Sequence, residues 1–175
     1  MPRASSKTPA SRDTSSWERP GPRGQNLAIE DFPSLILTRL GAIAKWKITK
    51  QYVEPFGLSL PEWLLVALLA RCPAVTHRQI RDRTFMDKGQ ISTTLRTLIA
   101  RGLVAARAPG GAARGSSSSS EMRLTAKGKA LYGRILPAAQ EAQMRVLQFF
   151  DADERNQLHG LLRRMLAALD DMTTS

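Results

Sequence analysis

Four residue pairs in this 175-residue chain have the spacing of a helix capping box. In that motif an N-cap side chain and a Glu or Gln three positions later bond each other's backbone amides. Each pair directly precedes a segment whose apolar residues recur at helical spacing. The pairs are Ser59 with Glu62, Thr76 with Gln79, Asp87 with Gln90, and Asp151 with Glu154. They predict helices over residues 60–71, 77–83, 88–101 and 152–170, and therefore a mainly α-helical protein.

Apolar periodicity and turn residues predict the remaining elements. One further helix covers residues 32–53, and another covers residues 126–150, with a kink or a new segment expected at Pro137. Residues 103–108 and 121–124 have the character of short strands. Between them lies PGGAARGSSSSS, which cannot be a strand interior and predicts a flexible loop.

The first 28 residues differ from the rest of the chain in composition. They are rich in Ser, Pro, Arg and Gly, and Trp17 is almost their only large apolar side chain. Such a segment buries too little surface to offset the entropy of ordering it. Residues 1–28 are therefore expected to be a disordered basic tail. An inert tail is the favoured interpretation, and an arm that tracks along DNA is the alternative. Residues 29–175 are expected to form the folded part.

The charge of the chain is strongly basic and unevenly distributed. Lys and Arg number 26 against 15 acids, for a formal charge of +11. Residues 76–114 are rich in Lys and Arg, whereas residues 151–175 are net acidic. A local excess of this size indicates a polyanionic partner, either nucleic acid or an anionic membrane surface. No stretch approaches the roughly 20 apolar residues of a membrane span, and the single cysteine, Cys72, fits a protein of the reducing cytoplasm.

The predicted helix 88–101 has two contrasting faces. One face is apolar and is expected to meet a core: Ile91, Leu95, Leu98 and Ile99. The opposite face carries small neutral side chains and one cation: Gly89, Gln90, Thr93, Arg96 and Thr97. Thr and Gly are poor helix formers, but Arg, Gln and Thr can contact base edges in a DNA major groove. A threonine-rich surface without any partner remains the alternative.

The order helix, turn, helix, strand, glycine-rich tip and strand predicts a winged helix-turn-helix. Three segments, LSLPEWLLVALLA, MDKGQISTTLRTLIARGLV and LTAKGKALYGRILPAAQEAQ, resemble consecutive signatures of MarR-type transcriptional regulators. The resemblance covers roughly residues 30–171. It implies a homodimer that binds a palindromic operator in double-stranded DNA, and many members release DNA when a small aromatic or phenolic effector binds. Dimerisation is then expected at about residues 30–55 and 126–171, and DNA binding at about 58–125.

The residues expected to contact DNA lie on helix 88–101, on the start of the preceding helix and in the wing. They are Thr76, Arg78, Lys88, Gly89, Gln90, Thr93, Thr94, Arg96, Thr97 and Arg114. Two features depart from the family pattern. The wing lacks the usual acidic-then-arginine motif, so that Arg114 is the one candidate for the minor groove. Thr93 and Thr97 stand where relatives often carry arginine, and the operator sequence therefore does not follow from the resemblance.

A small-molecule site is a second expectation. Arg39 lies inside the apolar stripe of the first predicted helix, where its guanidinium must be paired or must meet an anion. Trp46 and Trp63 can supply flat aromatic walls beside it. The favoured alternative is that Arg39 pairs with an acid at the dimer interface and that both tryptophans belong to the core.

No cofactor or metal site is expected. His77 and His159 with Cys72 do not form a zinc set, and no residue group resembles a nucleophile with its base, a carboxylate pair or a phosphate loop. Cys72 is better interpreted as a structural thiol than as a redox sensor. The chain is therefore expected to be a regulator and not an enzyme.

Taken together, these patterns favour a ligand-released transcriptional repressor. Two other functions remain open at this point. One is a winged-helix module that binds protein, and the other is an architectural DNA-binding protein without sequence preference or ligand.

Overall fold

The computed structural model describes residues 15–18, 20–72, 74–84, 86–107 and 120–174, and the chain forms two compact units, residues 1–44 and 45–175. The first unit holds α1 (Ser15–Glu18), the 3₁₀ turn η1 (Ile29–Asp31) and α2 (Pro33–Ala44). Within the predicted tail, the described residues thus include a short helix. Residues 1–14 and 19 lie outside the described residues.

The second unit begins with a change of helix type. The π-helical segment η2 (Lys45–Thr49) leads directly into α3 (Lys50–Val53) and the 3₁₀ turn η3 (Glu54–Phe56). Gly57 ends this stretch with a left-handed φ of 64°, which glycine adopts without steric penalty. Of the helix predicted over residues 32–53, residues 33–53 are helical and Phe32 is extended, but the π-turn has no signal in the apolar pattern.

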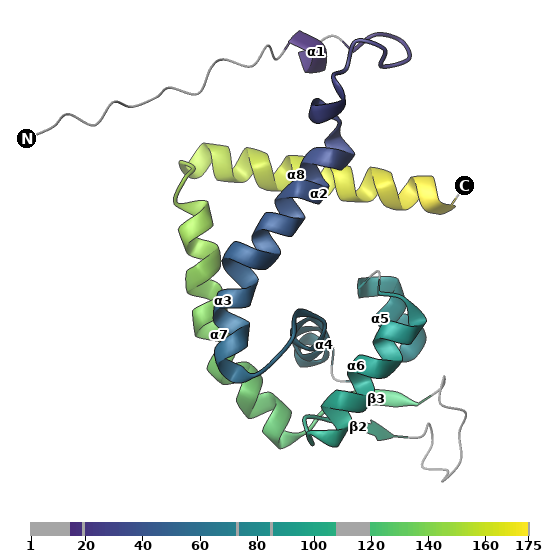
Figure 1. Ribbon diagram of the computed structural model, residues 1–175, viewed down its shortest axis with the longest axis vertical. Helices are drawn as coiled ribbons and strands as arrows, with labels where there is room; N and C mark the ends of the chain where they lie inside the picture. The colour runs from purple at the N-terminus through teal and green to yellow at the C-terminus, as the bar shows by residue number, and fades with distance from the viewer. Residues whose placement is uncertain (1–14, 19, 73, 85, 108–119, 175) are drawn as a thin grey trace, which may run out of the picture. The chain divides into compact units, whose positions relative to one another are not determined.

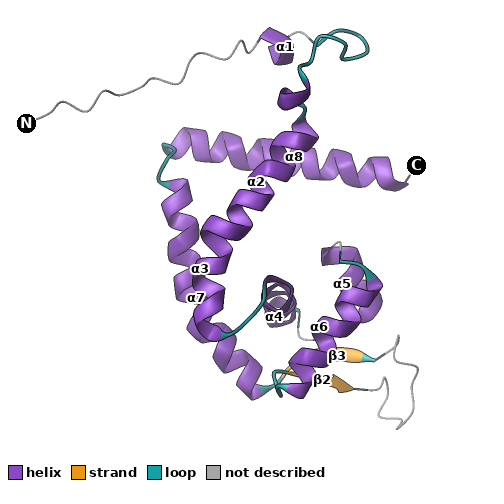
Figure 2. Cartoon of the chain, viewed as in Figure 1, coloured by secondary structure: helices purple, strands orange, loops and turns teal. Residues whose placement is uncertain are grey.

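Three short helices and a small sheet follow, as Figure 2 shows. The helices are α4 (Leu60–Arg71), α5 (His77–Thr84) and α6 (Lys88–Ala100). The strands are β1 (Val75–Thr76), β2 (Val104–Arg107) and β3 (Glu121–Leu124), in the antiparallel order β1-β3-β2. The pairing of Val104 with Leu124 and of Val75 with Met122 sets their register. The sequence-based prediction missed β1, because two residues are too few to show an alternating pattern.

The predicted capping pairs bond as expected at the helix starts. In three pairs both bonds of the capping box form: Ser59 with Glu62, Thr76 with Gln79, and Asp151 with Glu154. At α6 the Asp87 carboxylate accepts from the Gln90 N–H at 2.8 Å. The local sequence therefore predicted the start of each of these helices correctly.

Two long helices complete the chain (Figure 1). They are α7 (Ala126–Leu147) and α8 (Ala152–Thr174). α7 continues through Pro137 and does not restart there. Of the two outcomes predicted at Pro137, a new segment is therefore excluded.

The core of the second unit lies between α3, α4, α5, α6, the sheet and α7. Its largest side chains that are less than 2% exposed, or at that limit, come from all of these helices: Val53, Leu65, Val66, Ile80, Ile91, Leu95, Leu98 and Ile135. Ile99 was predicted on the core face of α6 but is 41% exposed. It lies at the margin of the apolar stripe, where the neighbouring elements no longer cover it.

Candidate nucleic-acid interface

The exposed face of α6 brings together six of the residues predicted to contact DNA. Its opposite face is held in the core, since Ile91, Leu95 and Leu98 are at most 2% exposed. The helix is therefore fixed in its rotation about its own axis. The exposed residues are Lys88, Gly89, Gln90, Thr93, Arg96 and Thr97.

Gly89 has a structural reason to be glycine. A β-carbon at this position would lie 3.1 Å from Oδ1 of Asp87, the carboxylate that caps the helix. A larger residue would require this carboxylate to move by a few tenths of an ångström. The sequence-based interpretation assigned Gly89 only to the DNA-contacting face, whereas it also preserves the cap and leaves the first turn of α6 open.

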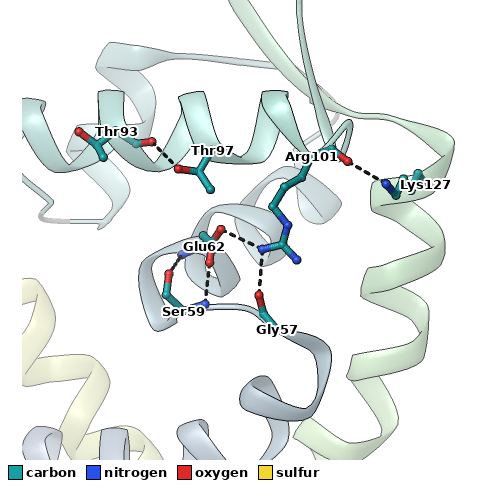
Figure 3. A network of polar contacts seen from close by, with 7 residues as sticks. All are labelled: Gly57, Ser59, Glu62, Thr93, Thr97, Arg101 and Lys127. Carbon is teal, nitrogen blue, oxygen red and sulfur yellow. Dashed lines mark hydrogen bonds and ion pairs between the residues drawn. The ribbon is translucent and has the colours of Figure 1, made fainter.

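Thr94 does not belong to the exposed face, contrary to the prediction. Its side chain is buried at 7% exposure, and its hydroxyl donates to the carbonyl of Gln90 at 2.7 Å. Thr97 is exposed, and its hydroxyl donates to the carbonyl of Thr93 at 3.2 Å (Figure 3). With its hydroxyl used within the helix, Thr97 offers mainly its methyl group to a partner.

Arg96 lies on the side of α6 that faces the hairpin. It lines a shallow depression of about 370 Å³ between α6 and the strands β2 and β3. The other lining residues are His77, Ser92, Leu95, Ile99, Ala106, Ser120 and Met122. Arg96 thus lies between the exposed face of α6 and the strands of the hairpin.

α5 adds further cations beside α6. Arg78 is highly exposed, with 84% of its side chain accessible, and it lies 3.9 Å from Asp82, which Arg81 also approaches at 3.5 Å. Exposed pairs of this kind contribute little stability. Arg83 donates to the Sγ of half-buried Cys72 at 2.7 Å.

Thr76 and Arg114 are the first and last residues, in chain order, of the predicted DNA contacts. The hydroxyl of Thr76 accepts from the N–H of Gln79 at 3.3 Å, so it is engaged in capping α5. Arg114, predicted for the minor groove, lies outside the described residues.

The three residues predicted for a small-molecule site differ in their surroundings. Arg39 is exposed on α2, in the first unit. Trp63 is 7% exposed, with its ring centroid 5.8 Å from those of both Tyr52 and Tyr132. For Trp63 the alternative interpretation, a core residue, is therefore confirmed.

Trp46 lines a cavity in the second unit instead. The cavity has a volume of about 260 Å³, and Trp46 itself is 60% exposed. The Nζ of Lys50 lies 4.5 Å from the centroid of the Trp46 ring and 3.2 Å from Glu54. The full lining is Lys45, Trp46, Thr49, Lys50, Val53, Glu54, Leu58, Ser59 and Leu60.

The lysines of this cavity were missed by the sequence analysis. On an α-helical wheel, residues five apart such as Lys45 and Lys50 point in clearly different directions. The π-helical turn of η2 has a wider repeat, which brings both residues to the wall of one cavity. The spacing of two lysines around Trp46 was the available signal, but it has meaning only once the π-turn is known.

Among the residues that the structure describes, no group of three or more His, Cys, Asp or Glu side chains is placed to hold a metal ion. Over the same residues no single helix is long and apolar enough to cross a membrane, although the bent pair 33–56 and 60–71 meets both criteria together.

Comparison of the sequence with known proteins finds one matching family. The sequence pattern of the MarR family matches residues 56–115, which run from η3 to beyond β2. The HTH-type transcriptional repressor Rv2887 of Mycobacterium tuberculosis is 27% identical over 137 residues. That alignment covers 78% of this chain and 95% of the repressor.

Solved structures are similar over most of the chain. A MarR/EmrR family transcriptional regulator from Acinetobacter matches with a TM-score of 0.73 at 22% identity, over 83% of this chain and 99% of that one. Rv2887 in complex with salicylic acid matches with a TM-score of 0.64 at 27% identity, over 79% and 99%. Rv2887 in complex with DNA matches with a TM-score of 0.58 at 25% identity, over 76% and 96%.

Proposed function

Because this chain belongs to the MarR family of DNA-binding transcriptional regulators, we propose that it is a cytoplasmic homodimeric repressor that a small aromatic acid releases from a palindromic operator. The family consists of regulators and not of enzymes. The observation that carries the proposal is the exposed polar face of α6, held on a rigid core within a cation-rich segment.

The chemistry of α6 suits a DNA major groove, which admits one helix. Arg96 can donate two hydrogen bonds to guanine, and Gln90 can bond adenine on its donor and acceptor edge. The methyl group of Thr97 suits a thymine methyl, since its hydroxyl is used within the helix. Lys88 and Arg78 supply charge for phosphates, and the amino end of α6 adds its partial positive charge.

The cavity beside Trp46 suits an aromatic carboxylate. The exposed indole offers a flat apolar surface, and Lys45 and Lys50 offer ammonium groups to an anion. Glu54 neutralises part of this charge through its pair with Lys50. A volume of about 260 Å³ fits a single-ring compound, and the complex of Rv2887 with salicylic acid supports this choice of ligand class.

The dimer is proposed to form through the carboxyl-terminal helix. α8 exposes Leu161, Leu162 and Leu166 at 58%, 43% and 55%. A contiguous apolar surface of this kind is more often part of a protein interface than exposed to solvent. A two-fold axis would place the same leucines of two subunits against each other, and would set two α6 helices for two operator half-sites.

Selection of random double-stranded DNA by the purified protein tests this proposal. Enrichment of a palindrome is expected, bound at least about 10³-fold more tightly than random DNA. Equal affinity for all sequences would support the architectural alternative, and no binding would support the protein-interaction module. Salicylate added to the operator titration should weaken binding by roughly 5–150-fold, with acetate at equal ionic strength as the control.

A further inference from the structure

One polar network holds the carboxyl-terminal end of α6, as Figure 3 shows. Arg101 follows α6 directly, and its Nη1 donates to Oε1 of Glu62 at 3.0 Å and to the carbonyl of Gly57 at 2.9 Å. The Nζ of Lys127 donates to the carbonyl of Arg101, also at 2.9 Å. The network therefore joins three parts of the second unit: the loop before α4, the end of α6 and the start of α7.

Glu62 is the only charged residue that is buried among those that the structure describes, at 7% exposure. Both of its carboxylate oxygens have donors, because Oε2 accepts from the N–H of Ser59 at 2.6 Å. A buried carboxylate is stable only while such partners remain. The geometry of the pair is therefore constrained, and the constraint acts on Arg101 and on the end of α6.

The same loop forms one wall of the cavity beside Trp46. Leu58, Ser59 and Leu60 line the cavity, whereas the carbonyl of Gly57 and the N–H of Ser59 belong to the network. A ligand that shifts this wall must also shift the groups that hold Glu62 and Arg101. The cavity and α6 are thus connected through a single short segment.

We infer that Glu62 and Arg101 form a positioning pair, which sets α6 for operator binding and transmits effector binding from the cavity to α6. The second half of this inference rests on the effector site proposed above. Arg101 acts in this view through α6 and not by contact with DNA. Glu62, being buried, has no access to DNA at all.

The variants Arg101→Gln and Glu62→Gln test the positioning half. Glu62→Gln keeps an oxygen for the Ser59 N–H but removes the charge that Arg101 faces. Each variant is expected to weaken operator binding by roughly 2–30-fold, while affinity for random DNA and the slope of log K against log salt remain those of the wild type. Arg164→Gln, on exposed α8, is the matched control for charge.

A loss of stability alone would give a different result. A smaller folded fraction would lower the apparent affinity for operator and for random DNA by the same factor, so their ratio would not change. Thermal unfolding, followed by circular dichroism, sets a temperature at which every variant is folded. Unchanged operator-to-random ratios at that temperature in both variants would overturn the positioning role.

Direct contact of Arg101 with a phosphate is also distinguishable. In that case Arg101→Gln would weaken all DNA, the salt slope would flatten by up to about 1.8 for a dimer, and Glu62→Gln would have no effect. This outcome would likewise overturn the inference.

Operator titrations with and without salicylate test the link to the cavity. If salicylate weakens wild-type binding, its effect should fall toward unity in both variants. Tryptophan fluorescence should report unchanged salicylate affinity, with Trp46→Phe as the control for the other two tryptophans. An equal effect in wild type and variants would overturn the link alone. No effect and no binding in the wild type would reject the effector site and the link together, and the positioning role would still be decided by the titrations without salicylate.

Discussion

Two exposed helical faces of the second unit, one on α6 and one on α8, differ in what they present to solvent. The face of α6 carries Lys88, Gln90, Thr93, Arg96 and Thr97, and on the opposite side Ile91, Leu95 and Leu98 are buried. α8 has no buried residue among those that the structure describes, and it exposes several leucines. Each helix therefore has a face that contacts no other part of the chain that the structure describes, and the two faces suit partners of different chemistry.

The difference shows how exposure can be interpreted as function. A polar face that uses poor helix formers is explained by a partner with hydrogen-bonding groups, as base edges have. An apolar face is explained by a partner that excludes water, because each fully buried leucine contributes about 1.5–3 kcal/mol. A substitution on α8 is therefore expected to change dimerisation. A substitution on α6 is expected to change DNA binding and to leave the dimer intact.

The largest effect is expected for Leu162→Asp combined with Leu166→Asp. In a two-fold interface each position counts twice, so roughly 6–12 kcal/mol of association free energy should be lost. Sedimentation at micromolar concentration should then show a monomer with unchanged helicity, and cooperative binding to a palindrome should disappear. Ala167→Asp, on the other side of α8, is the control and should leave the dimer intact. A dimer that survives the double substitution would place the interface elsewhere.

A smaller effect is expected for Arg96→Ala. If its guanidinium contacts a base edge, specific binding should weaken by about 1–3 kcal/mol, and the preference at one position of each half-site should relax. Titration of an operator and its single-base variants measures both quantities. Arg164→Ala removes the same charge from α8 and should change neither. Uniform weakening of every DNA sequence would instead assign Arg96 to a phosphate, in keeping with its place beside the wing.

The smallest effects separate two adjacent threonines. Thr94→Val removes a buried hydrogen bond to Gln90, so the free energy of unfolding should fall by about 1 kcal/mol or less, with operator preference unchanged. Thr93→Val changes an exposed side chain, so stability should stay within about 0.5 kcal/mol, whereas operator preference should change. Urea unfolding gives the stability of each variant, and operator titration gives the operator preference of each. The reverse pattern would mean that the DNA-contacting face of α6 has been assigned wrongly.

Much of the winged-helix unit follows from interactions between residues that are close in sequence. Ser59 with Glu62 and Asp151 with Glu154 form both bonds of their predicted capping boxes, because a capping box closes within one helical turn. The apolar stripe of α6 correctly placed Ile91, Leu95 and Leu98 in the core. The exposed polar residues opposite this stripe follow from the same periodicity.

Residues at the edge of that stripe could not be assigned in this way. Ile99 is exposed and Thr94 is buried, although a helical wheel places the two at similar angles on either side of the stripe. A wheel describes the directions of side chains, but the neighbouring elements decide which directions are covered. The pair of Lys45 and Lys50 beside Trp46 likewise depended on a π-turn that no apolar pattern announces.

The sequence by itself determined the helix starts, the hairpin, the winged-helix order and the polar character of α6, because capping, turn formation and amphipathic periodicity act within a few residues. Only the tertiary structure decided the ion pair of Glu62 with Arg101, whose partners lie 39 residues apart. The same holds for Gly128, where a β-carbon would lie 2.1 Å from the carbonyl oxygen of Leu103. Contacts of this kind exist only after helices and strands have packed, since close packing, and not local preference, brings distant atoms together.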